Sequence, residues 1–419
     1  MANSIEFVDW LTMESLRILV NKLECAQFMN TDANKEFEKE FPVGETVRIK
    51  LPQRFVVTTG LGYTPQPIQR RHTTVTCDQI FQIGFEWDSI EKALKLDRGR
   101  DAIRREYVEP AVAALVQQID SSAALFAYQH TNNIVGQLGV DPTTMTTFQQ
   151  ARQRLIEMAC PAGGERGMII PPQVNTSIVP ALASFLNPTS EISRQYKQGS
   201  LGILSGFDMY ESVSLYRHTA GTWAGAVTVN GANQSGSSIL INATAGDTFN
   251  IGDVIAFDNV RPVNPQTRRV VGNLPFINKQ FVVTAPLIAV GGGVDALQIE
   301  PALEGPGGNP IDNQYQNVDF LPANLAALTL FPGTPGPSGK SGVQALALQR
   351  DAFAMVGVKL ELPTAVEMSS QTRDPQTGLS IRFTRTWDAV QSKMLNRFDL
   401  LLGFGELYPD NCAVRMLCA

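Results

Sequence analysis

The sequence has few of the residues that most often form metal or redox sites. It contains three histidines and five cysteines in 419 residues. The number of cysteines is odd, and no close pair has the spacing of a metal ligand set or a redox motif. We therefore expect a reducing compartment, with these thiols as small buried groups. The histidines have no cysteine or carboxylate at ligand spacing, so we expect no metal and no cofactor. These residues are Cys25, Cys77, Cys160, Cys412 and Cys418, and His72, His130 and His218.

Common catalytic motifs are also missing. There is no Gly-x-Ser-x-Gly elbow, and no Gly-x-Gly-x-x-Gly follows an expected strand. The segment 334–341 ends in Gly-Lys-Ser, as a phosphate-binding loop does. However, Thr334 stands where the first glycine should be, and Pro335 and Pro337 each remove an amide N–H that would bind phosphate. We interpret this segment as a linker and expect no enzyme activity; a nucleotide hydrolase that uses Lys340 is a distant alternative.

The chain has neither an excess of cations nor a long apolar run. Its formal net charge is −6, which argues against tight nucleic-acid binding but allows a surface that faces nucleic acid without gripping it. The weakly apolar run 281–294 is broken by Pro286 and three glycines and is too short to cross a bilayer. The N-terminus lacks the features of a signal peptide. We therefore expect a soluble protein made and kept inside a cell, with no membrane partner.

The most prominent feature that is present is a long amphipathic helix. Apolar residues recur at spacings of three and four from Val108 to Phe126, which is one face of a helix. Pro110 suits the first turn, and a helix over about 109–132 would be roughly 36 Å long. The opposite side, which includes Asp120, should meet water or a polar neighbour. Such a helix would also fit the core of any large α+β protein.

The chain before this helix predicts an N-terminal helix and a long arm. Thr12 looks like an N-cap of a short amphipathic helix, and 30–42 is a polar, charged stretch. Alternating residues predict strands at 44–52 and 73–85. The polar excursion between them has no core, so we expect a two-stranded arm that must lie on another surface, such as another subunit.

The chain after this helix predicts an α+β host interrupted by an all-β module. Helices are expected at 88–96, 147–158 and 175–186, and a buried strand at 168–170. At 419 residues, two or three domains are expected. Between about 221 and 339 short β runs alternate with glycine, proline and asparagine, which favours a small barrel or sandwich. The expected strands of the module are 226–229, 238–241, 254–257, 280–284 and 296–299. The later elements, mostly strands, are expected at 345–354, 356–362, 380–387 and 397–407.

This order of elements resembles the Hong Kong 97-type major capsid proteins of tailed phages, and most closely the coat-protein family of P-twenty-two-type short-tailed phages. The segments that carry the resemblance are Glu14-Ser-Leu-Arg-Ile-Leu, Gly44-Glu-Thr-Val-Arg-Ile, Tyr107-Val-Glu-Pro-Ala, Leu204-Ser-Gly-Phe-Asp-Met-Tyr-Glu-Ser and Gln349-Arg-Asp-Ala-Phe-Ala. The resemblance implies an α+β capsid fold with a long spine helix, an extended β-hairpin loop and an inserted small all-β, barrel-like domain.

The resemblance also implies a domain layout. It consists of an N-terminal arm (1–44), an extended loop (45–88), a peripheral domain with the spine helix (89–160 and 372–405), an axial domain (161–220, 340–371 and 406–419) and the inserted β domain (221–339). The sequence departs from the family in two places. The segment 230–237 is short and uncharged where the best-known member has an acidic bridging loop. The segment 58–72 has no lysine, so a covalent isopeptide cross-link is not expected. About 45 residues precede the loop, so we expect no fused scaffolding domain.

The implied function is that of a major capsid protein with no catalytic site. It would self-assemble into pentamers and hexamers of an icosahedral phage head that encloses double-stranded DNA without sequence-specific contacts. A scaffolding protein and a portal protein are the implied partners. Assembly would take place in the host cytoplasm, followed by residence in the virion capsid. An encapsulin-like cargo shell would share the fold but normally lacks the β insertion.

Three groups of charged residues are candidates for contacts. Arg70 and Arg71 near the tip of the loop are candidates for inter-subunit contacts. Arg104, Arg105 and Glu109 at the start of the spine helix could form inter-subunit ion pairs or only a solvated helix end.

The third group is acidic and lies in the N-terminal region. Glu6, Asp9 and Glu14 could steer a basic scaffold helix, an attraction that salt would weaken. They could equally be the solvated face of an amphipathic helix.

Overall fold

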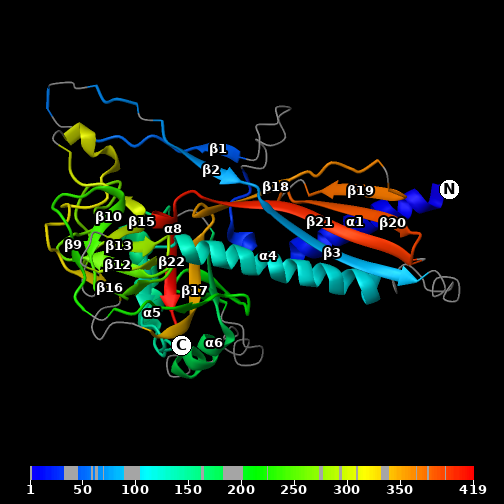
Figure 1. The fold of residues 1–419 in the computed structure, drawn as a ribbon, viewed down its shortest axis with the longest axis horizontal. Helices are drawn as coiled ribbons and strands as arrows, with labels where there is room; N and C mark the ends of the chain where they lie inside the picture. Colours follow the sequence, from blue (N-terminus) through cyan, green and yellow to red (C-terminus); the bar gives the residue numbers. More distant parts are fainter. Residues whose placement is uncertain are drawn as a thin grey trace. The chain divides into compact units, whose positions relative to one another are not determined.

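The structure is a computed structural model, drawn as a ribbon in Figure 1. It describes the chain apart from residues 1, 33–45, 58–59, 62–64, 69, 89–103, 162–164, 183–201, 224, 273–276, 292–294, 308–309, 332–338, 365, 375–376 and 392. The helix expected at 88–96, apart from Asp88, and most of the stretch 30–42 lie outside the described residues. The chain divides into two compact units. Unit 1 is Met1–Ile49, His72–Ala123 and Phe353–Leu407, and unit 2 is Lys50–Arg71, Ala124–Ala352 and Tyr408–Ala419.

Unit 1 begins with α1 (Ala2–Lys22), which is longer than expected. Thr12 therefore lies inside the helix, and the prediction that it is an N-cap is wrong. Its Oγ1 donates to the Asp9 carbonyl at 2.9 Å and lies 3.0 Å from Ser370 Oγ. A threonine inside a helix can bond to the preceding turn in this way. The close approach of Thr12 to Ser370 places α1 against the neighbouring sheet.

The sheet of unit 1 has five antiparallel strands. Its order is β18-β21-β20-β19, and β3 also pairs with β21. The strands are β3 (Gln79–Asp88), β18 (Phe353–Val358), β19 (Met368–Arg373), β20 (Ser380–Asp388) and β21 (Lys393–Glu406). The buried rings of Phe383 and Phe398 face each other across β20 and β21, with centroids 5.1 Å apart. Such cross-strand aromatic pairs stabilise a sheet on its buried face.

The strands that flank the extended loop are shorter than expected. β1 (Thr46–Lys50) pairs with β2 (His72–Thr76) in a two-stranded sheet, which confirms that the two segments pair. The single strand expected at 73–85 is wrong. The chain leaves β2 after Thr76, and Gln79, where the apolar alternation is interrupted, begins β3. Because β3 pairs with β21, its side chains belong to a different sheet.

The long helix α4 (Glu109–His130) confirms the expectation of a helix over about 109–132. A π-helical turn (Arg104–Val108) precedes it. Asp120, on its polar side, is 2% exposed. Its carboxylate accepts the backbone N–H groups of Glu24, Cys25 and Ala26 at 2.9, 3.0 and 2.9 Å. The polar side of the helix thus meets a polar neighbour, the short 3-10 helix η1 (Ala26–Phe28).

Unit 2 contains a seven-stranded sheet with the order β4-β22-β17-β5-β7-β6, in which β8 also pairs with β17. Its strands are β4 (Ile134–Gly136), β5 (Arg166–Ile170), β6 (Ile203–Leu204), β7 (Phe207–Glu211), β8 (Arg217–Thr219), β17 (Ser341–Gln349) and β22 (Ala413–Leu417). The helices are α5 (Met145–Glu157), α6 (Pro172–Leu182) and the short α8 (Pro409–Cys412). The expected helices at 147–158 and 175–186 and the strand at 168–170 correspond to α5, α6 and β5.

The segment between β8 and β17 forms a second, antiparallel sheet, which we call the β module. Its order is β16-β12-β13-β15-β10-β9. The strands are β9 (Thr228–Val229), β10 (Gly236–Asn242), β12 (Val254–Phe257), β13 (Gln280–Val283), β15 (Asp295–Leu303) and β16 (Leu328–Leu330), with a separate pair, β11 (Thr248–Phe249) and β14 (Leu287–Ile288). A bridge between Thr228 and Ala327 brings β9 to the start of β16, so the six strands close into a ring.

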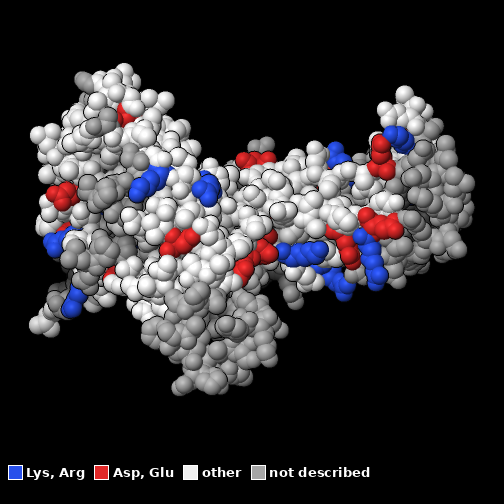
Figure 2. Space-filling model, turned by 90° about the horizontal axis from the view of Figure 1, so that it is seen from below, with Lys and Arg blue, Asp and Glu red and all other residues white. Residues whose placement is uncertain are grey.

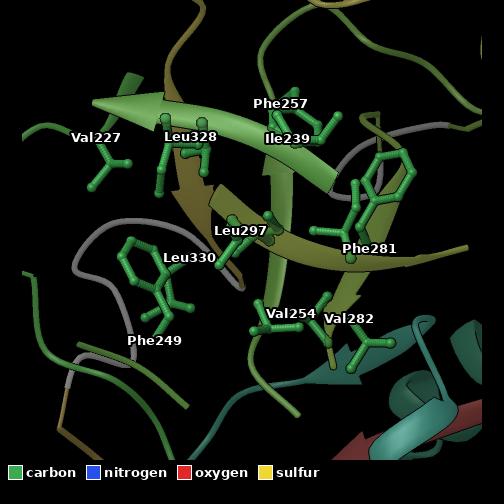
Figure 3. Packing of buried hydrophobic residues seen from close by; sticks show 14 of the residues in the cluster. Val227, Ile239, Phe249, Val254, Phe257, Phe281, Val282, Leu297, Leu328 and Leu330 are labelled. Carbon is green, nitrogen blue, oxygen red and sulfur yellow. The ribbon is translucent and has the colours of Figure 1, made fainter. Parts of the chain in front are cut away.

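The core of the β module lies inside this ring. Figure 3 shows Ile239, Leu297 and Phe281, from three different strands, pointing toward one another. All three are fully buried, and the rings of Phe257 and Phe281 pack edge to face with centroids 5.4 Å apart. The cluster continues into the host sheet through Ile134. The sequence therefore builds the module from short strands, each of which contributes between one and three large apolar residues to the core.

Candidate assembly surfaces

The described part of the extended loop has an outgoing segment (50–57) and a returning segment (65–71). The Leu51 N–H donates to the Arg71 carbonyl at 3.0 Å, and the Val56 N–H donates to Gln66 Oε1 at 2.9 Å. These bonds hold the two segments side by side without a regular ladder. The loop therefore has local order but no apolar core of its own.

Several apolar side chains of the loop are exposed. Phe55 is 62% exposed, Val57 90%, Leu61 109% and Ile68 73%. Scattered exposed apolar residues are common on proteins, but contiguous groups of them mark interaction sites. Four exposed apolar residues on one loop make this segment a candidate contact surface.

The two arginines predicted at the loop lie in different environments. Arg70 is exposed. Arg71 Nη2 lies 2.7 Å from Glu304 Oε1 of the β module, and its guanidinium carbon lies 3.6 Å from the centroid of the Tyr315 ring. In the subunit as it stands, Arg71 therefore binds its own chain, and sequence reasoning missed this pair because Glu304 is more than 200 positions away.

The charged residues predicted at the start of the spine helix lie on two consecutive elements. Arg104 and Arg105 lie in the π-helical turn and Glu109 begins α4. Arg105 is exposed and Glu109 is half-buried. An acidic residue at a helix N-terminus interacts favourably with the helix dipole, so Glu109 has a local role whether or not it also meets another subunit.

Two of the three acidic residues predicted in the N-terminal helix have partners within unit 1. The Asp9 carboxylate accepts a hydrogen bond from Ser370 Oγ at 2.6 Å, although Asp9 is otherwise exposed. Glu14 pairs with Arg17 one turn later at 2.9 Å. Glu6 belongs to α1, and its side chain lies outside the description. Of the two carboxylates that the structure describes, Asp9 is the more accessible to a partner.

A buried ion pair fixes the β module to the C-terminal part of the host. Lys279, which is fully buried, pairs through Nζ with Asp410 Oδ1. Asn132 Nδ2 donates to the same oxygen at 2.8 Å. Burial lowers the pKa of Lys279. Burial alone would raise the pKa of Asp410, but Lys279 and Asn132 outweigh it and hold that pKa below its ordinary value.

A second buried polar cluster surrounds His218. Its Nε2 lies 3.0 Å from Asp253 Oδ1, and its Nδ1 contacts Tyr128 Oη. Tyr128 Oη also donates to the Ile251 carbonyl at 2.8 Å. Burial raises the pKa of Tyr128. A histidine, a carboxylate and a hydroxyl could in principle act as a catalytic relay. Here all three side chains are at most 5% exposed, so the cluster holds the module turn 250–253 in place.

Arg415 completes this cluster from β22. Its Nη2 donates to the Gly252 carbonyl at 2.9 Å, and its guanidinium carbon lies 5.0 Å from the Tyr128 ring centroid. Burial lowers the pKa of Arg415 to about 10. Gly252 has a φ of +88°, and a Cβ at this position would overlap Tyr128. The position therefore requires glycine.

The Gly-Lys-Ser sequence at 339–341 is used for β pairing. The Gly339 N–H donates to the Gly221 carbonyl at 3.2 Å, and the Lys340 carbonyl accepts the Ala220 N–H at 2.9 Å. Ser341 begins β17. One amide that a nucleotide-binding loop would use for phosphate, that of Gly339, thus already bonds to the backbone of the same chain, which favours the linker interpretation.

Charged residues of both signs share the molecular surface. On the face drawn in Figure 2, Lys and Arg lie among Asp and Glu rather than in a single cationic area. This agrees with the formal net charge of −6. In the described part of the chain, no helix is both long and apolar enough to cross a membrane.

Comparison with known proteins identifies the family. A family model described as "P22 coat protein - gene protein 5" matches residues 38–417. No curated protein matches the chain. Similar solved structures include one described as Mycobacterium phage Che8, with 12% identity over 94% of this chain and 91% of that chain and a TM-score of 0.44. A second is the capsid of the cyanophage P-SCSP1u, with 12% identity over 90% of this chain and 84% of that chain and a TM-score of 0.42. A third is a virus-like particle from Pyrococcus furiosus, with 7% identity over 98% of this chain and 100% of that chain and a TM-score of 0.38.

The family match covers most of the chain, so it decides the class of protein. The protein is a structural protein of phage heads. The chain belongs to the P22 coat protein family, as its sequence resemblance predicted. The structural likenesses have TM-scores below 0.5 and do not contribute to this assignment.

Proposed function

We propose that this chain is the major capsid protein of an icosahedral phage head, and that it assembles into pentamers and hexamers that enclose double-stranded DNA. The observation that carries the proposal is the family match over residues 38–417. Membership of a coat protein family implies self-assembly into a shell of many copies. Closed shells built from one chain use repeated heterologous contacts, and their energy comes from surfaces that the single subunit leaves uncovered.

We further propose the Hong Kong 97-type arrangement of domains. In it, the segments 89–160 and 372–405 form the peripheral domain around α4. The segments 161–220, 340–371 and 406–419 form the axial domain, and 221–339 is the inserted domain. Supporting observations are the long helix, the separate two-stranded sheet of β1 and β2, and the closed ring of strands in the β module.

The extended loop is proposed to contact neighbouring subunits. Its exposed apolar side chains support this role, because burying them against a second copy would be favourable at roughly 25 cal/mol per Å² of apolar surface. Arg70 is exposed and could join such a contact. The loop is therefore a surface whose stabilisation is completed by assembly.

DNA inside the head is proposed to meet a surface that does not bind it tightly. The net charge of −6 and the mixed charges of Figure 2 support this. A surface without dense cationic patches displaces few phosphate counterions, so DNA can enter and leave. We propose that the protein acts through these contacts and not by catalysis, and that a portal protein completes the head.

A scaffolding protein is the proposed partner of the N-terminal helix during assembly in the host cytoplasm. Asp9 is exposed and acidic, and Glu14 lies on the same helix, so a basic scaffold helix could be steered to them. Asp9→Lys and Glu14→Lys should leave the subunit folded but weaken the binding of scaffold at low salt. Scaffold affinity equal to that of the wild type would leave the helix with a packing role alone.

The test of the main proposal is expression of the full-length chain, alone and together with the scaffolding protein of its own phage. Sedimentation and negative-stain electron microscopy should show fast-sedimenting closed particles. Only monomers or small oligomers under both conditions would contradict it.

A further inference from the structure

A single buried amide of the β module joins both segments of the extended loop. Gln314 lies in the 3-10 helix η5 (Pro310–Tyr315) and is 1% exposed. Its Oε1 accepts Gln53 Nε2 of the outgoing segment at 3.0 Å. Its Nε2 donates to Gln66 Oε1 at 3.3 Å and to the Pro67 carbonyl at 3.4 Å on the returning segment. A glutamine side chain offers both donors and acceptors, and here both ends are used on the loop.

The backbone around Gln314 is also held by Arg268, another residue of the module. Arg268 Nη2 donates to the Gln314 carbonyl, and Arg268 Nη1 donates to the Gln316 carbonyl at 3.3 Å. Burial lowers the pKa of Arg268, and the nearby cation Arg54 lowers it further. The two carbonyl contacts fix the backbone around Gln314, so the amide is presented in one orientation.

The same surface holds the base of the returning segment. Arg71 lies between Glu304, at 2.7 Å, and the face of Tyr315, at 3.6 Å from the ring centroid. A guanidinium that pairs with a carboxylate and stacks on an aromatic face is bound in a defined geometry. Tyr315 Oη also lies 3.5 Å from Gln53 Oε1, on the outgoing segment. Three residues of the module thus contact the loop, and two of them, Gln314 and Tyr315, contact both of its segments.

We propose that Glu304, Gln314 and Tyr315 form a loop-binding surface, by which the β module holds the extended loop of the same subunit and sets the direction in which its apolar side chains meet a second copy of this chain. Figure 1 shows the loop running beside the segment that carries these residues. On this account Arg71 is a positioning residue inside the subunit, and Arg70 remains available for the neighbour. The binding of the loop is a property of the single subunit and does not depend on the proposed shell.

The test measures hydrogen exchange in the unassembled full-length chain after separation by size. The reporters are the amides of Leu51 and Val56, which form the hydrogen bonds that hold the two segments together. Arg71→Ala should speed their exchange about two- to fivefold, as expected for losing a partly exposed ion pair and a cation–π contact. Gln314→Ala should do the same. Arg70→Ala is the matched control and should exchange like the wild type.

A charge exchange separates this role from general destabilisation. Arg71→Glu should speed exchange, and Arg71→Glu combined with Glu304→Arg should restore part of the slow exchange. Hydrogen exchange in the peptides of β10 and β13 reports whether the module itself stays folded. If Gln314→Ala speeds exchange in those peptides, the proposal is judged on the Arg71 variants alone. Unchanged exchange in Arg71→Ala, or an equal effect of Arg70→Ala, would overturn the proposal.

Particles observed by electron microscopy give a separate answer. If the wild type forms shells but the exchange rates do not respond, the loop-binding surface is wrong and the shell function stands. If the exchange rates respond but no shells form, the loop-binding surface stands and the proposed shell function is wrong.

Discussion

The buried pair Lys279–Asp410 gives the sharpest stability prediction. Lys279 is fully buried, whereas the side chain of Asp410 keeps 22% of its surface exposed. Asp410→Asn keeps an oxygen that can accept from Asn132 but leaves Lys279 with an uncompensated buried charge. Breaking a buried pair in this way costs about 3–5 kcal/mol. Lys279→Met leaves Asp410 unpaired but partly hydrated, so we expect a smaller loss of about 2 kcal/mol.

The assay is hydrogen exchange of the β13 amides as a function of urea, which reports the local free energy of unfolding. The double variant Lys279→Met/Asp410→Asn should be more stable than Asp410→Asn alone, because the buried charge is removed. Lys340→Met replaces an exposed lysine and is the control, with an expected change below about 0.5 kcal/mol. If the loss of unfolding free energy in the double variant equalled the sum of the losses in the two single variants, the reasoning would be refuted.

The sign of the pH dependence offers a second test of the same pair. In Asp410→Asn, Lys279 loses its acidic partner, and its pKa in the folded chain should fall further below the unfolded value. The unfolded state then binds more protons, so stability rises with pH. The gap to the wild type should narrow as pH rises from about 7 to 10. In the wild type, the lowered pKa of Asp410 adds stability above about pH 4 that is lost as pH falls through that pKa. A gap that widens toward pH 10 would contradict the assignment.

Three further predictions concern other parts of the chain. At pH 8 the native protein should react with a thiol reagent first at Cys160, because a hydrogen bond from Cys412 and a nearby arginine lower the pKa of its thiol. The other four buried thiols should react only on unfolding. Faster labelling of another thiol would refute this. Gly252→Ala should cost about 2 kcal/mol or more, because φ is +88° and Tyr128 fills the space; urea unfolding with no change in midpoint would refute it. A fragment of residues 221–339 should unfold cooperatively with a β-type circular dichroism spectrum, since its ring of strands is local; a coil-like spectrum would count against this boundary.

Local pattern was sufficient for much of the secondary structure. Spacings of three and four predicted α4 almost to its ends, and a short apolar run between turn residues predicted β12 at Val254–Phe257. These signals are local because side chains of a helix or strand face the core again every few residues. The strand 73–85 failed for a related reason. Pattern shows that residues are extended, but the partner strand decides which sheet they join, and β3 pairs with β21 about 310 positions later.

The buried polar contacts could not be predicted from the sequence. Lys279 and Asp410, or Arg71 and Glu304, are brought together only by the tertiary fold, and nothing near either residue marks its partner. A charged residue directly before an apolar strand, such as Lys279 before β13, is the one available signal, because lysine is rarely buried unless it is paired. Asp120 gave a comparable signal on α4, because a polar side of a helix predicts contact with either water or a polar neighbour. The contact groups proposed at Arg104, Arg105 and Glu109 remain predictions.

The central claim is that many copies of this chain close into a shell of fivefold and sixfold rings. Cryo-electron microscopy of particles assembled from the full-length chain tests it directly. We expect icosahedral particles whose reconstruction resolves pentamers and hexamers, with the extended loop of each subunit covered by a neighbour. Particles with no fivefold and sixfold rings, or a chain that stays monomeric beside its own scaffolding protein, would contradict it.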